Sequence, residues 1–143
     1  MREIIFRGKR LDNGEWAEGF YISHLNACHY IIPFRTGGYE AMDNSFYVHK
    51  WFEVDPSTIS QYTGLKDKNG KMIFEQDILG SRYDDLCPDD VTIEVVKWFR
   101  NGWYVQEKAY SPDLLEEYGV LPVSEIIGNA YDTPELLKEE DET

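Results

Sequence analysis

Apolar and polar residues alternate over short stretches of this chain, and turn-forming residues separate one stretch from the next. The apolar positions are rich in Ile, Val, Tyr, Phe and Trp, which favour the half-buried face of a β-sheet. The pattern predicts strands at residues 2–11, 15–23, 28–34, 45–54, 58–63, 72–83, 91–100, 103–108 and 124–131. Short strands at this even spacing predict a mainly β protein.

Three Asn-Gly pairs lie between predicted strands, at residues 13–14, 69–70 and 101–102. Asn and Gly tolerate the positive φ angles that tight hairpin turns require. A two-residue loop at the first and third pairs predicts four favourable cross-strand contacts: Leu11–Trp16, Lys9–Glu18, Phe99–Tyr104 and Trp98–Val105. At the second pair such a loop would place Lys68 opposite Lys71, so we expect a longer loop with Gly70 in the left-handed region.

Two short helices are expected in the last third of the chain. Ser111 can cap a helix that starts at Pro112 and ends before Gly119. Thr133 can cap a helical turn that starts at Pro134, and the two leucines of that turn would dock on the body of the protein.

The order of these elements predicts two small β subdomains. Residues 1–60 would form an N-terminal subdomain of hairpins and strands. Residues 61–143 run through strand, acidic loop, hairpin, helical insert, strand and acidic tail. This is the order of a small, partly open SH3-like barrel of five strands, in which closing the sheet hides its edges.

Charge is distributed unevenly along the chain. The 14 Lys and Arg residues and 27 Asp and Glu residues give a net charge of −13. Residues 1–70 hold 8 basic and 9 acidic side chains, a net of −1, whereas residues 71–143 hold 6 basic and 18 acidic ones, a net of −12. Such a field repels nucleic-acid phosphates and anionic membranes and attracts basic proteins. Solubility alone also accounts for it.

Cysteine and histidine are sparse. The N-terminus has no apolar stretch typical of a signal peptide, so we expect reduced thiols in a cytoplasm. A zinc site built from His24, Cys28, His29 and Cys87 would lack the paired short spacings that such sites use. Alternation along a strand also points Cys28 and His29 to opposite faces. We therefore expect no metal and no cofactor, although the sequence leaves open whether these four residues approach each other.

Three blocks of the sequence carry motifs of a known protein family. The first is Ile5-Phe-Arg-Gly-Lys-Arg-Leu-Asp-Asn-Gly-Glu-Trp16, followed by Gly19-Phe-Tyr-Ile22. The second is Gln61-Tyr-Thr-Gly-Leu-Lys-Asp-Lys-Asn-Gly-Lys-Met-Ile-Phe-Glu75, with Asp77-Ile78 after it. The third is Ile126-Ile-Gly-Asn-Ala-Tyr-Asp-Thr-Pro-Glu-Leu-Leu137. In these three blocks the chain resembles the YopX family of phage and prophage proteins. The resemblance implies a β-rich fold in two parts and a phage or prophage origin, but no settled activity.

One position departs from the family pattern. The family commonly reads Glu-Gly-Asp where this chain has Glu75-Gln76-Asp77. If the glycine adopts a positive φ angle, Gln76 either strains the turn or the turn is built differently here.

Motifs that carry chemistry are missing. The chain has no phosphate-binding glycine loop, no Gly-x-Ser-x-Gly elbow and no EF-hand spacing. His24, His29 and His49 could each act as a base, but none of them lies in a sequence motif that identifies a nucleophilic residue next to it. We therefore expect the protein not to be an enzyme, and keep an uncharacterised enzyme as the last alternative.

The main hypothesis is an accessory protein that binds a basic host or phage protein through an acidic C-terminal surface. The candidate contacts are Asp84, Asp85, Asp89 and Asp90. The alternative is a nucleic-acid-binding small barrel, with the basic cluster Arg2, Arg7, Lys9 and Arg10 as its candidate contacts. The net charge opposes this alternative. Self-association through exposed strand edges is compatible with every hypothesis.

Overall fold

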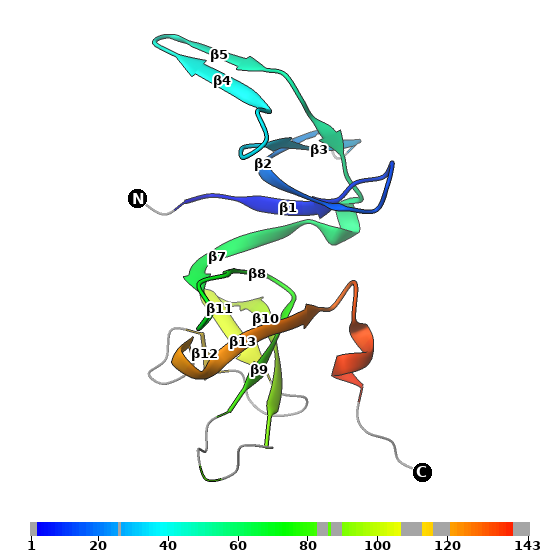
Figure 1. The fold of residues 1–143 in the computed structure, drawn as a ribbon. Coiled ribbons are helices and arrows are strands. Elements are labelled where there is room, and N and C mark those ends of the chain that lie inside the picture. Colours follow the sequence, from blue (N-terminus) through cyan, green and yellow to red (C-terminus); the bar gives the residue numbers. More distant parts are fainter. Residues whose placement is uncertain are drawn as a thin grey trace. The chain divides into compact units, whose positions relative to one another are not determined.

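The computed structural model of the chain describes residues 3–25, 27–82, 86, 90–106, 113–115 and 121–138. These residues form thirteen β-strands and three short 3-10 helices, so the predicted mainly β fold is confirmed (Figure 1). Contacts between residues divide the chain into two compact units, Met1–Tyr62 and Thr63–Thr143. We refer to them as the first unit and the second unit.

The first unit is a curled antiparallel sheet. Its elements are β1 (Phe6–Lys9), β2 (Trp16–His24), β3 (Cys28–Pro33), β4 (Tyr39–Met42), β5 (Ser45–Val48), β6 (Phe52–Glu53), the 3-10 helix η1 (Pro56–Thr58) and the start of β7 (Ser60–Lys66). Strands β6, β3, β2, β1 and β7 lie side by side in that order. After β6 the chain returns to the end of β1, where Arg10 bridges Val54 and the Leu11 N–H donates to the Glu53 carbonyl at 3.0 Å. The curled sheet encloses the buried side chains of Ala17, Ile31 and Val54.

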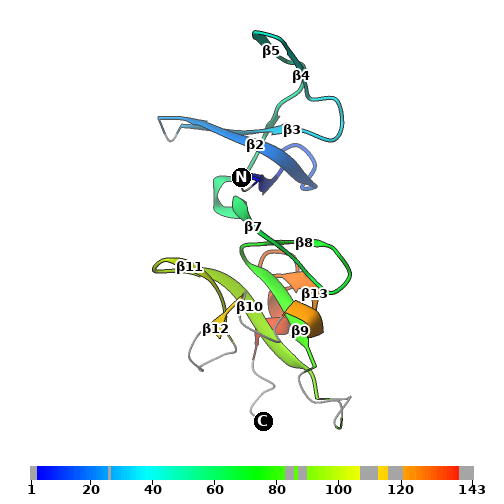
Figure 2. The same cartoon turned by 90° about the vertical axis from the view of Figure 1, so that its left-hand side faces the viewer.

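Strands β4 and β5 form a separate hairpin that leads away from β2 and β3 (Figure 2). The sequence pattern predicted no strand at residues 39–42, and it merged β5 and β6 into one strand. The Phe20 ring of β2 meets the base of the hairpin, with its centroid 5.3 Å from that of Tyr39 and 6.4 Å from that of Phe46. Gly38 lets the chain turn here, because a Cβ at this position would lie 2.1 Å from the Pro33 carbonyl oxygen.

The second unit is built on a five-stranded antiparallel sheet. Its elements are the end of β7, β8 (Met72–Phe74), β9 (Asp77–Ser81), β10 (Thr92–Phe99), β11 (Gly102–Gln106), β12 (Asp113–Leu114), the 3-10 helix η2 (Leu121–Val123), β13 (Ser124–Asn129) and the 3-10 helix η3 (Pro134–Leu137). The strand order is β12-β11-β10-β9-β13, and over the described residues the sheet does not close into a barrel. The core side chains are Ile73, Leu79, Val96, Val105 and Leu115.

The turn between β7 and β8 has the predicted longer loop. Gly70 adopts a φ angle of 80°, and the Asp67 N–H donates to the Lys71 carbonyl at 2.9 Å. The buried Asp67 carboxylate accepts hydrogen bonds from the N–H groups of Asn69 and Lys71, both at 2.9 Å, and from that of Ile126 at 3.0 Å. This one carboxylate therefore fixes the turn and ties it to β13.

The predicted registers of the other two hairpins are wrong. The structure pairs Lys9 with Trp16, Arg7 with Glu18, Trp98 with Trp103 and Phe99 with Gly102. In the first hairpin the loop is residues 10–15, because the Asn13 side chain accepts a hydrogen bond from the Glu15 N–H at 2.9 Å and lengthens the turn. In the β10–β11 hairpin Arg100 adopts a φ angle of 58°, so that Arg100 and Asn101 form the loop.

The last 3-10 helix, η3, lies where the sequence predicts a helical turn, but it lacks the predicted side-chain cap. The 3-10 helix η3 starts at Pro134 as predicted, but the Thr133 side chain makes no capping hydrogen bond. Its Oγ1 instead donates to the Asn129 carbonyl and accepts from the Asn129 N–H, both at 3.1 Å.

The helix predicted to start at Pro112 and end before Gly119 is wrong where the structure describes it. Residues 113–114 form strand β12, because their backbone pairs with Tyr104 and Val105 of β11, and the Leu115 N–H donates to the Trp103 carbonyl at 3.0 Å. The other residues of the predicted helix lie outside the described residues.

Candidate functional site

Most of the predicted acidic contacts lie outside the described residues. Asp84, Asp85 and Asp89 are among these, and so is Arg2 of the predicted basic cluster. Asp90 is described and exposed, just before β10. The acidic surface of the second unit therefore stays a prediction.

The rest of the predicted basic cluster comes together around two aromatic rings. The Arg7 guanidinium lies 4.6 Å from the centre of the Trp16 ring, and the Lys9 Nζ lies 5.5 Å from it. The Arg10 guanidinium stacks on the Phe52 ring at 3.9 Å. Such cation–π contacts hold the three cations in place on β1 and just after it.

The histidines and the described cysteine do not converge. His24 and Cys28 face each other across the β2–β3 turn, whereas His29 Nδ1 forms a 2.6 Å hydrogen bond with the Tyr21 hydroxyl. Cys87 lies outside the described residues. Over the described parts of the chain, no group of three or more His, Cys, Asp or Glu side chains could hold a metal ion. No helix in these parts is long and apolar enough to cross a membrane.

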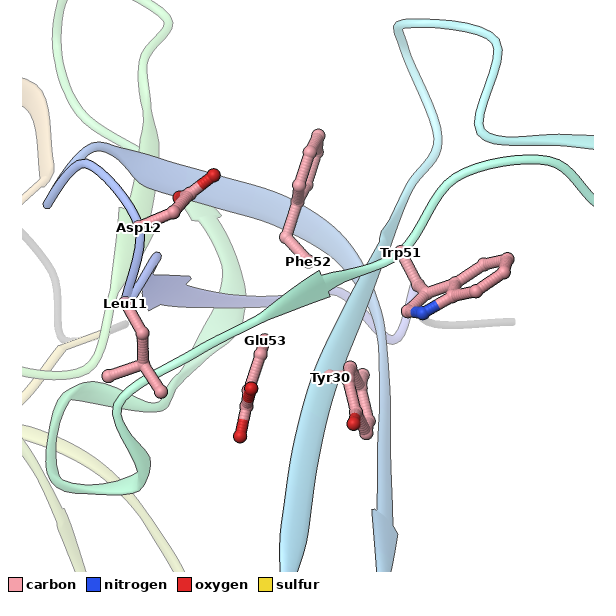
Figure 3. A pocket seen from close by; sticks show the side chains of 6 residues that line it. All are labelled: Leu11, Asp12, Tyr30, Trp51, Phe52 and Glu53. Carbon is pink, nitrogen blue, oxygen red and sulfur yellow. The ribbon is translucent and has the colours of Figure 1, made fainter.

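A pocket of about 520 Å³ lies in the first unit, beside the short edge strand β6 (Figure 3). It is lined by Leu11, Asp12, Tyr30, Trp51, Phe52 and Glu53. The volume is in the range of small-ligand sites, and it also suits one side chain of a partner protein. We call it the Glu53 pocket.

Backbone pairing brings the residues of the Glu53 pocket together from three segments. Tyr30 of β3 lies directly opposite Glu53 of β6, and the hydrogen bond from the Leu11 N–H to the Glu53 carbonyl brings the β1–β2 loop to the same place. Figure 3 shows the side chains of Leu11, Tyr30 and Glu53 on one side of β6, whereas Phe52 points to the other side. Trp51 and Leu11 are each 58% exposed, so the pocket offers apolar surface to a ligand.

The two carboxylates of the Glu53 pocket differ in their partners. Arg10 holds Asp12 through hydrogen bonds of 2.6 and 2.9 Å, and these hydrogen bonds lower the pKa of Asp12. Glu53 is exposed, and no basic side chain of the described residues forms an ion pair with it. The net charge of this pocket is therefore negative.

The Tyr30 phenol has two acidic neighbours, of which Glu53 lines the pocket and Cys28 does not. Its pKa is raised above the ordinary value, first by the charge of the Cys28 thiolate and then by that of Glu53. A negative neighbour opposes formation of the phenolate, which is the cause of the shift. A cation that enters the pocket would meet the carboxylate and the π-faces of the rings together.

The chemistry of the Glu53 pocket suits binding. Its rings and its carboxylate match an ammonium or guanidinium group, through an ion pair and a cation–π contact. No Ser, Thr, Cys or His side chain lines it, so it offers neither a nucleophile nor an imidazole base.

Comparisons with known proteins place the chain in a family. The sequence matches the YopX protein family over residues 6–138, which is nearly the whole chain. The chain belongs to the YopX family. A comparison with curated proteins finds no match. Among solved structures, the crystal structure of protein EF1440 from Enterococcus faecalis is similar, with a TM-score of 0.67 at 20% identity. The likeness covers 96% of this chain and 100% of EF1440, and it shows a shared fold.

The sequence analysis of this YopX family member missed the residues of the Glu53 pocket. An exposed Trp beside a carboxylate, at Trp51-Phe52-Glu53, is a weak signal that could have drawn attention to this segment. The sequence could not show that Glu53 pairs with Tyr30, because these two residues lie more than twenty positions apart in the chain. The β4–β5 hairpin, which the sequence did not predict, lies between them.

Proposed function

We propose that this YopX family chain is a non-enzymatic accessory protein of a phage or prophage, which acts by binding a basic partner protein. The observation that carries the proposal is the Glu53 pocket, where a carboxylate without a basic partner among the described residues sits beside exposed apolar and aromatic side chains. The phage origin is supported by the family to which the chain belongs.

An Arg or Lys side chain of the partner fits this pocket. Its charged end would pair with Glu53, while its alkyl stem and the face of its head group would contact Tyr30 and Trp51. A cation–π contact contributes about 0.5–2 kcal/mol, depending on how far it is desolvated. Exposed Trp and Tyr side chains are also typical anchors of protein interfaces.

The charge of the second unit supports the same kind of partner. Residues 63–143 contain 8 basic and 19 acidic side chains, a net of −11. A field of this sign speeds the encounter with a basic protein and excludes acidic ones. We propose Asp84, Asp85, Asp89 and Asp90 as contacts that add to this attraction.

The test is co-purification from the host bacterium at low and high salt, with partners identified by mass spectrometry. The tagged wild-type chain is compared with Glu53→Gln and Trp51→Ala. Asp43→Asn is the control, because it removes one exposed carboxylate of the β4–β5 turn and leaves the pocket intact. We expect a partner that salt releases and that both pocket variants lose.

Three results would contradict the proposal. One is capture that does not respond to salt. Another is equal capture by the wild type and by both pocket variants. The third is a loss that Asp43→Asn shares.

A further inference from the structure

We infer that the first unit also holds a second site, of opposite charge, for the phosphate and base of a nucleotide. The site is a pocket of about 420 Å³ that shares the Phe52 side chain of β6 with the Glu53 pocket. Its cations are Arg10, Arg35 and Lys50, and its ring walls are Trp16 and Phe52. We call it the Arg35 pocket.

Most basic residues of the first unit lie at the Arg35 pocket or beside it. Residues 1–62 contain six Lys and Arg residues. Three of them line the Arg35 pocket, and two more, Arg7 and Lys9, lie over the Trp16 ring that forms part of its wall. The sixth, Arg2, lies outside the described residues. A unit that gathers five of its six basic residues around one cavity has a local surface suited to an anion.

The cations reach the pocket from three segments of the chain. Arg10 comes directly after β1, Arg35 follows β3, and Lys50 lies between β5 and β6. Arg10 is engaged with Asp12 and stacked on Phe52, so it shapes the wall more than it supplies charge. Arg35 and Lys50 are exposed, so solvent and ligands reach their charged ends. The Arg35 guanidinium lies 5.0 Å from the centre of the Phe34 ring, and Lys50 Nζ donates a long hydrogen bond of 3.4 Å to the Thr36 carbonyl. These two residues are therefore placed to receive a phosphate.

The remaining walls favour a ligand that carries a flat ring. Trp16, Phe52 and Pro33 supply apolar surface, and base stacking on an aromatic side chain contributes about 1–3 kcal/mol. Glu18 places one carboxylate in the same pocket, where it can accept a hydrogen bond from a base amino group or a sugar hydroxyl. An acidic peptide has no flat ring that could stack on Trp16 or Phe52.

The net charge of −13 does not prevent binding at this pocket. Charges further apart than about 8 Å are largely screened at physiological ionic strength. A single nucleotide therefore responds to the cations that line the pocket. The first unit as a whole is nearly balanced, with 6 basic and 8 acidic side chains in residues 1–62.

Two ligands share this chemistry, a free nucleotide and one nucleotide of a single-stranded nucleic acid. The experiment distinguishes between them. The full chain at about 50 mM salt is titrated by calorimetry with AMP, adenosine, inorganic phosphate and a hexaglutamate peptide. Binding of a fluorescein-labelled oligo(dT) is followed by polarisation. The test variant is Arg35→Ala with Lys50→Ala. The control is Lys97→Ala with Arg100→Ala, which removes two exposed cations from the second unit.

We expect AMP to bind more tightly than adenosine or phosphate alone. The Arg35→Ala, Lys50→Ala variant should weaken binding at least tenfold, and the control should change it less than twofold. Tighter binding of the oligonucleotide than of AMP would identify a single strand as the source, and equal or weaker binding would identify the free nucleotide.

The inference is overturned if neither AMP nor the oligonucleotide binds, if the control weakens binding as much as the test variant, or if hexaglutamate binds best. Since none of these titrations involves Glu53, their outcome is independent of the basic partner proposed above.

Discussion

At the scale of single residues, Gln76 shows where this chain differs from its family. Its φ angle of 69° is in the left-handed region that the family's usual glycine adopts without strain. The Gln76 N–H donates to the Val96 carbonyl at 2.8 Å, and its own carbonyl accepts from the Ala130 N–H at 2.9 Å. These two hydrogen bonds hold the residue in the unfavourable conformation. The sequence left two alternatives, a strained Gln76 or a turn that is built differently, and the positive φ angle decides for the first.

Replacing Gln76 by glycine should stabilise the protein. The left-handed conformation costs a non-glycine residue about 1–2 kcal/mol, and part of the gain is offset because glycine makes the unfolded chain more flexible. We expect the free energy of unfolding of Gln76→Gly to rise by about 0.5–1 kcal/mol in urea denaturation. Gln76→Ala is the control, since alanine keeps the strain. A gain shared by both variants would show that the side chain, and not the φ angle, is the cause.

The Tyr30 phenol is the residue-scale probe of the Glu53 pocket. Because Cys28 and Glu53 both raise its pKa, Cys28→Ser and Glu53→Gln should each move the pKa down towards its ordinary value, with the larger change in Cys28→Ser. The ring signals of 13C-labelled tyrosine, assigned with Tyr30→Phe, give the titration by NMR. A Tyr30 pKa that is unchanged in Glu53→Gln would show that this carboxylate does not act on the pocket.

At the scale of elements, the sequence predicted strands well and hairpin registers poorly. Residues 28–33 and 124–129 are strands where the pattern expected them. The registers failed because they depend on which residue enters the loop, and this is decided by the Asn13 side chain in one hairpin and by the left-handed Arg100 in the other. Residues 39–42 were missed because the β4–β5 hairpin alternates weakly, and most of its side chains are exposed.

The β10–β11 register can be tested with a double-mutant cycle. Trp98 and Trp103 lie directly opposite each other, with ring centroids 4.9 Å apart in an edge-to-face arrangement. Such pairs contribute about 0.5–1.5 kcal/mol beyond the area that they bury. We expect this coupling between Trp98→Ala and Trp103→Ala in urea denaturation. Coupling of the same size between Trp98→Ala and Val105→Ala would instead support the register with Asn101-Gly102 as the turn.

At the scale of the whole molecule, the chain is two β units with different charge. The first has a net charge of −2 and holds both pockets, and the second has a net charge of −11. Composition showed the charge asymmetry, and three blocks of the sequence showed the resemblance to the family. Neither could show the pockets, because each is assembled from segments that only the fold brings together. The sequence analysis therefore found the cations Arg7, Lys9 and Arg10 but not the residues of the Glu53 pocket.

The most direct measurement for the proposed function is an NMR titration of the full chain with a short Arg-rich peptide, with the citrulline version of the peptide as a neutral control. We expect the arginine peptide to shift the Trp51 indole and Tyr30 ring signals, and Glu53→Gln to weaken this binding at least fivefold, while Asp43→Asn leaves it unchanged. Equal shifts with the citrulline peptide, or arginine binding that Glu53→Gln does not weaken, would contradict a site for a basic partner in this pocket.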